Sequence, residues 1–126
     1  VGYPLSQDLD GLNVTRGSVS GAKGLEGDAT NMQITAPIQP GNSGGPVVNK
    51  QGAIVGVVVS KLNEQWYQKR KGVTPQNVNF AIRGEIAKLY LFQNNVSPQI
   101  AQTRDPVGPV ALARAAQAYT VFLECR

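Results

Sequence analysis

The most informative stretch of this 126-residue sequence is Pro40-Gly41-Asn42-Ser43-Gly44-Gly45-Pro46. Small residues surround one hydroxyl group, that of Ser43. Acyl transfer needs such an oxygen at a bend, with backbone N–H groups directed at the carbonyl oxygen that becomes an oxyanion. Gly41 can supply one N–H, because a residue without Cβ adopts left-handed conformations freely. By composition alone the stretch fits a flexible polar turn equally well, since Gly, Asn, Ser and Pro dominate turns.

The flanking sequence favours a turn held rigidly between strands. Residues 31–36 place apolar side chains at period two, which predicts a half-buried strand. Two valines follow the turn, and Gln51-Gly52 then leads into residues 53–60, which predicts a hairpin. The second strand of this hairpin is apolar on both faces, so we expect it to be buried. Residues 77–82 predict another strand downstream.

The remaining elements are assigned from the spacing of apolar residues and from the residues, such as Pro and Gly, that end helices and strands. Residues 12–19 are β-prone, and residues 61–76 read as a long polar loop. Residues 85–92 change to helical spacing, and the Pro-rich residues 95–109 read as a linker. Residues 110–118 are alanine-rich and could be helical.

The end of the chain allows two readings. Residues 119–125 are strongly β-prone and could form an added strand. The alternative is one amphipathic helix over residues 110–124. We divide the chain into a domain over residues 1–94 and an extension over residues 95–126, made of the linker and this helix or strand.

Composition excludes several classes of protein. The sequence is 41% hydrophobic and holds 14 Gly and 8 Pro, which favours short strands and turns over a helical bundle. The longest apolar run, residues 53–59, is far too short to span a membrane. The net charge of +4 is mild, and its densest cluster, Lys69-Arg70-Lys71 near Trp66, reads as a solvated loop rather than a nucleic-acid site.

Cysteine and histidine usage is also informative. Cys125 is the one cysteine, so no internal disulfide can form, and the chain contains no histidine. We expect no metal site and no cofactor. The sequence shows no signal peptide and no N-terminal Met, so it reads as a trimmed piece or as the middle of a longer protein.

A second motif also matches the serine turn. Gly41 to Gly45 fits the G-x-S-x-G nucleophile elbow of α/β-hydrolases, which requires a helix directly after the serine and a downstream histidine. Here Pro46 and two valines follow, and histidine is missing. The hydrolase reading therefore fails.

The sequence resembles the C-terminal barrel of HtrA/Deg-type trypsin-like serine proteases. The resemblance rests on residues 40–49, on the glycine-bounded strand 52–56 and on residues 77–82, with weaker support from residues 1–4 and 17–21. It extends over residues 1–92. It implies a mainly β fold, a six-stranded antiparallel Greek-key β-barrel that forms the C-terminal half of the chymotrypsin-like double barrel, with a short helix after it and a C-terminal extension.

The resemblance also implies roles for individual residues. Ser43 would be the nucleophile of a serine endopeptidase, and the oxyanion hole would lie at Gly41, Asn42 and Ser43, with N–H groups from Gly41 and Ser43. Substrate backbone would pair with an added-strand site at Val59, Ser60 and Lys61. Residues 35–40, including Pro37 and Ile38, would line one wall of the specificity pocket, and this wall holds no carboxylate, so we expect a small to medium apolar residue before the scissile bond.

One departure from the family matters most. The family places its His and Asp in a separate N-terminal barrel, and this chain has no histidine. A serine without its base loses roughly 10⁶ in turnover. We therefore expect the chain alone to be inactive, with the N-terminal barrel of the same protein as a missing partner.

The resemblance leads to further expectations about partners and location. The other partner would be a polypeptide substrate, without nucleic acid and without a membrane span. The first strand would be largely absent, so exposed strand edges could pair copies of the chain. The resemblance suggests a periplasmic or secreted location. Two other functions stay open: a pseudo-protease that binds peptides without cutting them, and an interaction protein that uses the basic cluster.

Overall fold

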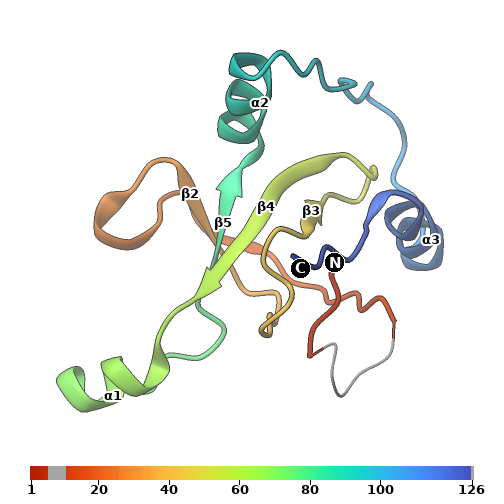
Figure 1. Cartoon of the computed structure of the whole chain (residues 1–126). Helices are drawn as coiled ribbons and strands as arrows, with labels where there is room; N and C mark the ends of the chain where they lie inside the picture. The colour runs from red at the N-terminus through yellow and green to blue at the C-terminus, as the bar shows by residue number, and fades with distance from the viewer. Residues whose placement is uncertain (6–10, 126) are drawn as a thin grey trace.

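The computed structural model describes residues 1–5 and 11–125. Its strands and helices are short (Figure 1). They follow in the order β1 (Val19–Gly21), η1 (Leu25–Gly27), β2 (Asn31–Ile34), β3 (Pro46–Val48), β4 (Ile54–Lys61), α1 (Glu64–Lys71), β5 (Asn79–Arg83), α2 (Gly84–Gln93) and α3 (Pro109–Tyr119).

The strands form one antiparallel sheet in the order β1-β2-β5-β4-β3. The mainly β prediction is confirmed, but a closed six-stranded barrel does not form in the described part of the chain. Closure requires the two outer strands to pair. Here β1 and β3 have three residues each and an irregular register, and the described chain before β1 forms only an isolated bridge between Asn13 and Gly2.

The core lies on one face of the central strands. Met32 and Ile34 of β2 are buried there together with Ala81 of β5, which has no exposed surface. Ala36, Val47 and Val55 pack against them. The predicted period-two strand over residues 31–36 is therefore confirmed by its burial pattern.

The hairpin of β3 and β4 forms as predicted, but the second strand is not buried throughout. Gly52 has a positive φ of 83° at the turn, and the Asn49 side chain accepts hydrogen bonds from the N–H groups of Gln51 and Ala53. Ile54 and Val59 of β4 are exposed, by 53% and 38%. β3 pairs with β4 as far as Val57, and residues 44–45 hydrogen-bond to Val58 beyond it, so Val59–Lys61 have no strand partner on that side among the described residues.

The prediction of a polar loop over residues 61–76 is wrong, because α1 forms inside it. The Asn63 side chain caps the helix by accepting from the N–H of Trp66 at 3.0 Å. Glu64 lies in the first turn and three basic residues lie in the last, which complements the helix dipole. Gly72 ends the helix in the left-handed conformation. These end effects stabilise a helix that buries none of its residues.

The other two helices match their predicted positions closely. α2 follows β5 directly, and α3 ends at Tyr119 with Thr120 as its C-cap. The predicted strand over residues 119–125 does not form, and the single helix over 110–124 stops early. Residues 120–125 instead return to the N-terminal segment, so that both ends of the chain meet (Figure 1).

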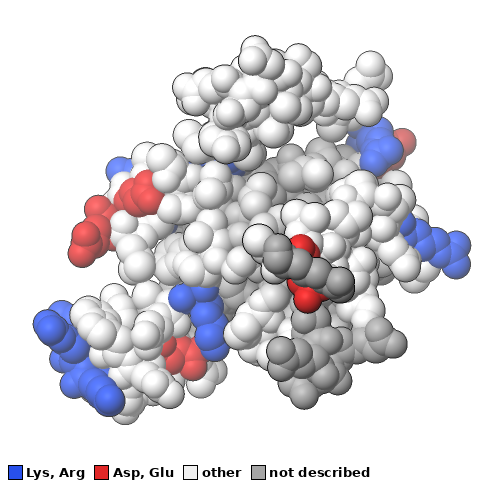
Figure 2. All heavy atoms as spheres, in the orientation of Figure 1, with Lys and Arg blue, Asp and Glu red and all other residues white. Residues whose placement is uncertain are grey.

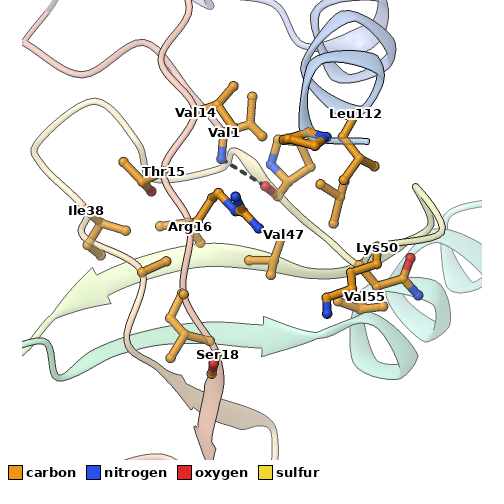
Figure 3. A pocket seen from close by; sticks show the side chains of 18 of the residues that line it. Val1, Val14, Thr15, Arg16, Ser18, Ile38, Val47, Lys50, Val55 and Leu112 are labelled. Carbon is orange, nitrogen blue, oxygen red and sulfur yellow. Dashed lines mark hydrogen bonds between the residues drawn. The ribbon is translucent and has the colours of Figure 1, made fainter. Parts of the chain in front are cut away.

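A cavity of about 410 Å³ lies between the sheet, residues 13–19 and the start of α3. Figure 3 shows its wall, with Arg16 lying between Val1 and Val47 and with Leu112 of α3 on the far side. The amino group of Val1 donates to the carbonyl of Pro46 at 3.2 Å, and its burial lowers its pKa. Among residues 1–5 and 11–125, none of the helices has the length and apolar composition that spanning a membrane requires.

Candidate functional site

The turn around Ser43 is fastened on two sides. On one side, the N–H of Gly44 donates to the carbonyl of Val58 at 2.8 Å, and the N–H of Val58 donates to the carbonyl of Gly45 at 2.9 Å. On the other side, the N–H of Leu5 donates to the carbonyl of Pro40 at 2.9 Å. The turn is therefore held between β4 and the N-terminal segment.

Glycine is required at two points of this turn by close backbone approach. A Cβ on Gly41, whose φ is +97°, would overlap the carbonyl oxygen of Tyr3. A Cβ on Gly45 would overlap the carbonyl oxygen of Val1. Gly44 also has a positive φ, of 84°, but it faces open space. The glycines thus have different reasons to be present, and two of them let the N-terminal segment lie directly on the turn.

The backbone N–H groups of the turn divide into two sets. Those of Asn42, Gly44 and Gly45 donate to the carbonyls of Gln39, Val58 and Asn42. Those of Gly41 and Ser43 donate to no acceptor among residues 1–5 and 11–125. Two unsatisfied N–H groups two residues apart, on either side of one peptide unit, are the donors that an oxyanion requires.

Asn42 is placed differently from its neighbours. Its N–H is already donated to Gln39, so in this geometry it is not available to an oxyanion. Its side chain is buried, with 6% exposed, and its Oδ1 has no hydrogen-bond partner among the described residues. Asn42 therefore shapes the turn through its backbone, while its side chain points into the protein.

The hydroxyl of Ser43 is exposed and donates to the carbonyl of Val59 at 2.8 Å. A cavity of about 470 Å³ adjoins it. The wall of this cavity consists of glycines of the turn, Tyr3, two residues of β4 and residues 119–123. Its one titratable group besides Tyr3 is Tyr119, whose pKa is raised by burial. None of the described residues there is a carboxylate, lysine or histidine that could accept the proton of Ser43 at neutral pH.

The C-terminal segment over this cavity contacts the N-terminal segment through Tyr3. The hydroxyl of Tyr3 donates to the carbonyl of Thr120 at 3.3 Å, and the rings of Tyr3 and Phe122 meet edge to face with centroids 6.1 Å apart. Val121 and Leu123 are 68% and 86% exposed. The sequence indicates the β propensity of this segment but not its position beside Ser43, because the hydrogen bond that fixes the segment joins Tyr3 and Thr120, 117 positions apart.

The predicted substrate-pairing residues lie together at the end of β4. Val59, Ser60 and Lys61 are exposed. Ser60 and Lys61 pair with β5 on one side, and beyond Val58 no described strand pairs with β4 on the side of Ser43. This edge can accept the backbone of an extended peptide.

The two residues predicted for the specificity pocket are neighbours in sequence but differ in exposure. Pro37 is exposed, whereas Ile38 is buried and lines the interior cavity together with Val58. Asn79 donates from its side chain to the carbonyl of Ala36 at 2.8 Å, which fixes this segment against β5. Of the pair, Pro37 is the one whose surface is open to a ligand.

Comparisons with known proteins place this geometry in a family context. Residues 1–57 match the family described as the trypsin-like peptidase domain. The chain is 34% identical over 85 residues to the serine protease Do-like HtrB of Bacillus subtilis, covering 61% of this chain and 18% of that protein. It is 40% identical over 74 residues to a serine protease HtrA-like protein of Staphylococcus aureus, covering 50% of this chain and 10% of that protein.

A further relative matches almost the whole chain. It is a protein of Sinorhizobium fredii called y4bJ, 41% identical over 125 residues, which is 98% of this chain and 20% of that protein. This chain therefore spans a fifth or less of the length of these curated relatives. Together the comparisons confirm the similarity to HtrA-type trypsin-like serine proteases that the serine turn indicates.

Proposed function

We propose that this chain, an HtrA-type trypsin-like segment, supplies the nucleophile and the oxyanion hole of a serine endopeptidase. The observation that carries the proposal is the pair of unsatisfied N–H groups of Gly41 and Ser43, on either side of an exposed serine hydroxyl. Among the N–H groups of residues 41–45, these two alone lack an acceptor in the described structure. A carbonyl oxygen bound there would receive two hydrogen bonds that strengthen as it becomes an oxyanion.

The reaction would follow the order of acyl transfer. The Oγ of Ser43 releases its hydrogen bond to Val59 and attacks the carbonyl carbon of a peptide bond, while its proton passes to a base. The tetrahedral oxyanion is stabilised by Gly41 and Ser43. The C–N bond then breaks, the amine leaves with the proton, and water hydrolyses the serine ester.

The base for this reaction lies outside the described residues of the site. The cavity beside Ser43 offers only tyrosine hydroxyls, and the chain has no histidine. We therefore place the base on another part of the protein, which would approach from the side that residues 119–123 now line. The peptide would add to β4 at Val59–Lys61, with its residue before the scissile bond near Pro37.

A second function follows from the open edge of β4. If no base ever reaches Ser43, the open edge of β4 still binds extended peptides, and the protein is a peptide-binding pseudo-protease. The unsatisfied N–H groups would then hold a peptide carbonyl without turnover.

Labelling with a fluorophosphonate probe separates the two functions. The full-length protein that contains this chain is treated with the probe, and the modified residue is mapped by mass spectrometry. For a protease we expect modification of Ser43, none in a Ser43→Ala variant, and hydrolysis of unfolded polypeptide by the unmodified protein. A full-length protein that leaves the probe unreacted but binds extended peptides at this edge would instead be the pseudo-protease.

A further inference from the structure

Helix α1 extends from the end of β4 away from the sheet (Figure 1). None of its residues is buried, and Trp66 is 47% exposed. Surface helices ordinarily bury an apolar face, so a helix that buries none of its residues leaves its side chains available to a partner.

The charge of α1 is concentrated and unneutralised. Its last turn holds Lys69, Arg70 and Lys71, and Figure 2 shows Lys and Arg gathered at the outer end of α1. Within residues 1–5 and 11–125 the ion pair that forms joins Lys61 to Glu64 at 3.9 Å, so none of the three basic residues has a carboxylate within salt-bridge distance. Arg70 lies over the ring of Trp66 at 5.4 Å, which orients an aromatic surface beside the charge.

The position of α1 places this charge next to the open edge of β4. β4 runs past Ser43 toward α1, and on the side of Ser43 its last three residues pair with no described strand. A peptide antiparallel to β4, with its scissile bond at Ser43, would pass Lys61 with the residues before that bond. Farther upstream residues would then reach α1. The helix is about 12 Å long, which an extended chain covers in about four residues.

We propose that α1 selects polypeptide substrates that carry acidic residues about four to eight positions before the bond presented to Ser43. This inference rests on the proposed function and names its substrate class. The occupant is an acidic peptide rather than a nucleic acid, because the basic cluster spans a single helical turn and continues an edge shaped for peptide backbone. Nucleic acids are instead bound through longer tracks of phosphate contacts.

The test measures peptide binding by the full-length protein carrying Ser43→Ala, so that turnover does not interfere. Three fluorescent peptides of about twelve residues are compared by anisotropy. One has acidic residues upstream of a small apolar residue, one has the corresponding amides, and one has the acidic residues downstream. The same peptides are titrated against a variant that adds Lys69→Gln, Arg70→Gln and Lys71→Gln. The matched control adds Lys23→Gln, Lys88→Gln and Arg114→Gln, the same charge change on exposed residues elsewhere.

We expect the upstream-acidic peptide to bind about tenfold more tightly than the other two, since three exposed charge pairs each contribute modestly. The α1 variant should lose this preference and leave amide-peptide binding unchanged, whereas the control should keep it. Raising the ionic strength from about 0.05 M to about 0.5 M should reduce the preference.

Equal binding of acidic and amide peptides would overturn the inference, as would a preference that survives the α1 substitutions. Tight binding of a single-stranded oligonucleotide that the α1 variant loses, without any peptide preference, would assign this surface to nucleic acid. These failures differ from failure of the proposed function. If the amide peptide binds and the protein with Ser43 intact reacts with the probe, only the role of α1 is refuted; if no peptide binds and no probe reacts, the function itself is refuted.

Discussion

A paired alanine substitution tests whether Gly41 positions an oxyanion donor. Gly41 and Gly44 both have positive φ, +97° and +84°, so alanine at either position costs about 1–2 kcal/mol of backbone strain. Only at Gly41 does the new Cβ meet other atoms. It would overlap the carbonyl oxygen of Tyr3 and lie 3.1 Å from Cα of Pro4, whereas nothing lies within 4 Å of a Cβ on Gly44.

The two variants should therefore differ in stability and much more in reactivity. Gly41→Ala must displace the N-terminal segment and weaken the hydrogen bond from Leu5 to Pro40, which adds about 1 kcal/mol to the loss in unfolding free energy. Moving the Gly41 N–H also removes one oxyanion donor, and such a loss lowers the rate by about 10²–10³, or about 2.7–4 kcal/mol. Gly44→Ala keeps both donors, so its reactivity should change by only a few-fold.

The assay is the rate of fluorophosphonate labelling of Ser43 in the full-length protein, with denaturant unfolding of each variant as the control. A domain has about 5–15 kcal/mol of stability, so both variants should remain folded. Equal labelling of folded Gly41→Ala and the unsubstituted protein would refute the role of Gly41. Equal losses in the two variants would show that strain in the turn, rather than the donor, controls the rate.

Three further changes address the scaffold. Ile34→Ala should lower the unfolding free energy by about 2–5 kcal/mol in a denaturant titration, because Ile34 is 3% exposed in the core; a loss under 1 kcal/mol would mean that the site is already loosely packed. Asn63→Ala should raise hydrogen exchange in α1 by removing its cap, worth about 1 kcal/mol, without changing exchange in β5; unchanged protection in α1 would contradict the capping role. Hydrogen bonds from Thr30 and Asn31 hold the pKa of Asp28 in the folded protein below its ordinary value. Ionised Asp28 therefore stabilises the folded state at any pH above the pKa of the unfolded chain. This stabilisation is lost as the pH falls through the lower pKa of the folded protein. In the Asp28→Asn variant the unfolding free energy should therefore fall less steeply at acidic pH. An unchanged fall at acidic pH would show that Asp28 does not cause it.

Local sequence patterns predicted the parts of the fold that local chemistry controls. The alternation in residues 31–36 gave β2, helical spacing gave α2, and the Gln51-Gly52 turn gave the β3–β4 hairpin. Helix α1 was not predicted within residues 61–76, because an N-terminal cap and a charge gradient mark this helix in the sequence, whereas a helical spacing of apolar residues is missing. Sheet closure could not be read from sequence, because it depends on the register and length of outer strands.

Some features of the candidate site were likewise predictable from the sequence, and others were not. The residue type predicted an N–H donor at Gly41, and the resemblance implied a second at Ser43; in the described backbone neither N–H has an acceptor. Sequence did not reveal that the Asn42 N–H is engaged or that Ile38 faces the interior, since both depend on how the turn is fastened to β4. It also gave no sign that residues 119–123 lie beside Ser43, because no local pattern encodes a contact between the two ends of the chain.

The short, irregular outer strands affect how this sheet meets other chains. An open sheet offers its outer strands as templates for pairing with further copies, which is the usual route to aggregation. β1 and β3 each present only three residues, and their registers shift, so neither gives a long straight row of donors and acceptors. The open end of β4 lies between the serine turn and α1. Under the proposed function, an incoming extended chain would therefore pair with the segment beside Ser43, whereas the short edges of β1 and β3 would offer copies of the protein little backbone to pair with.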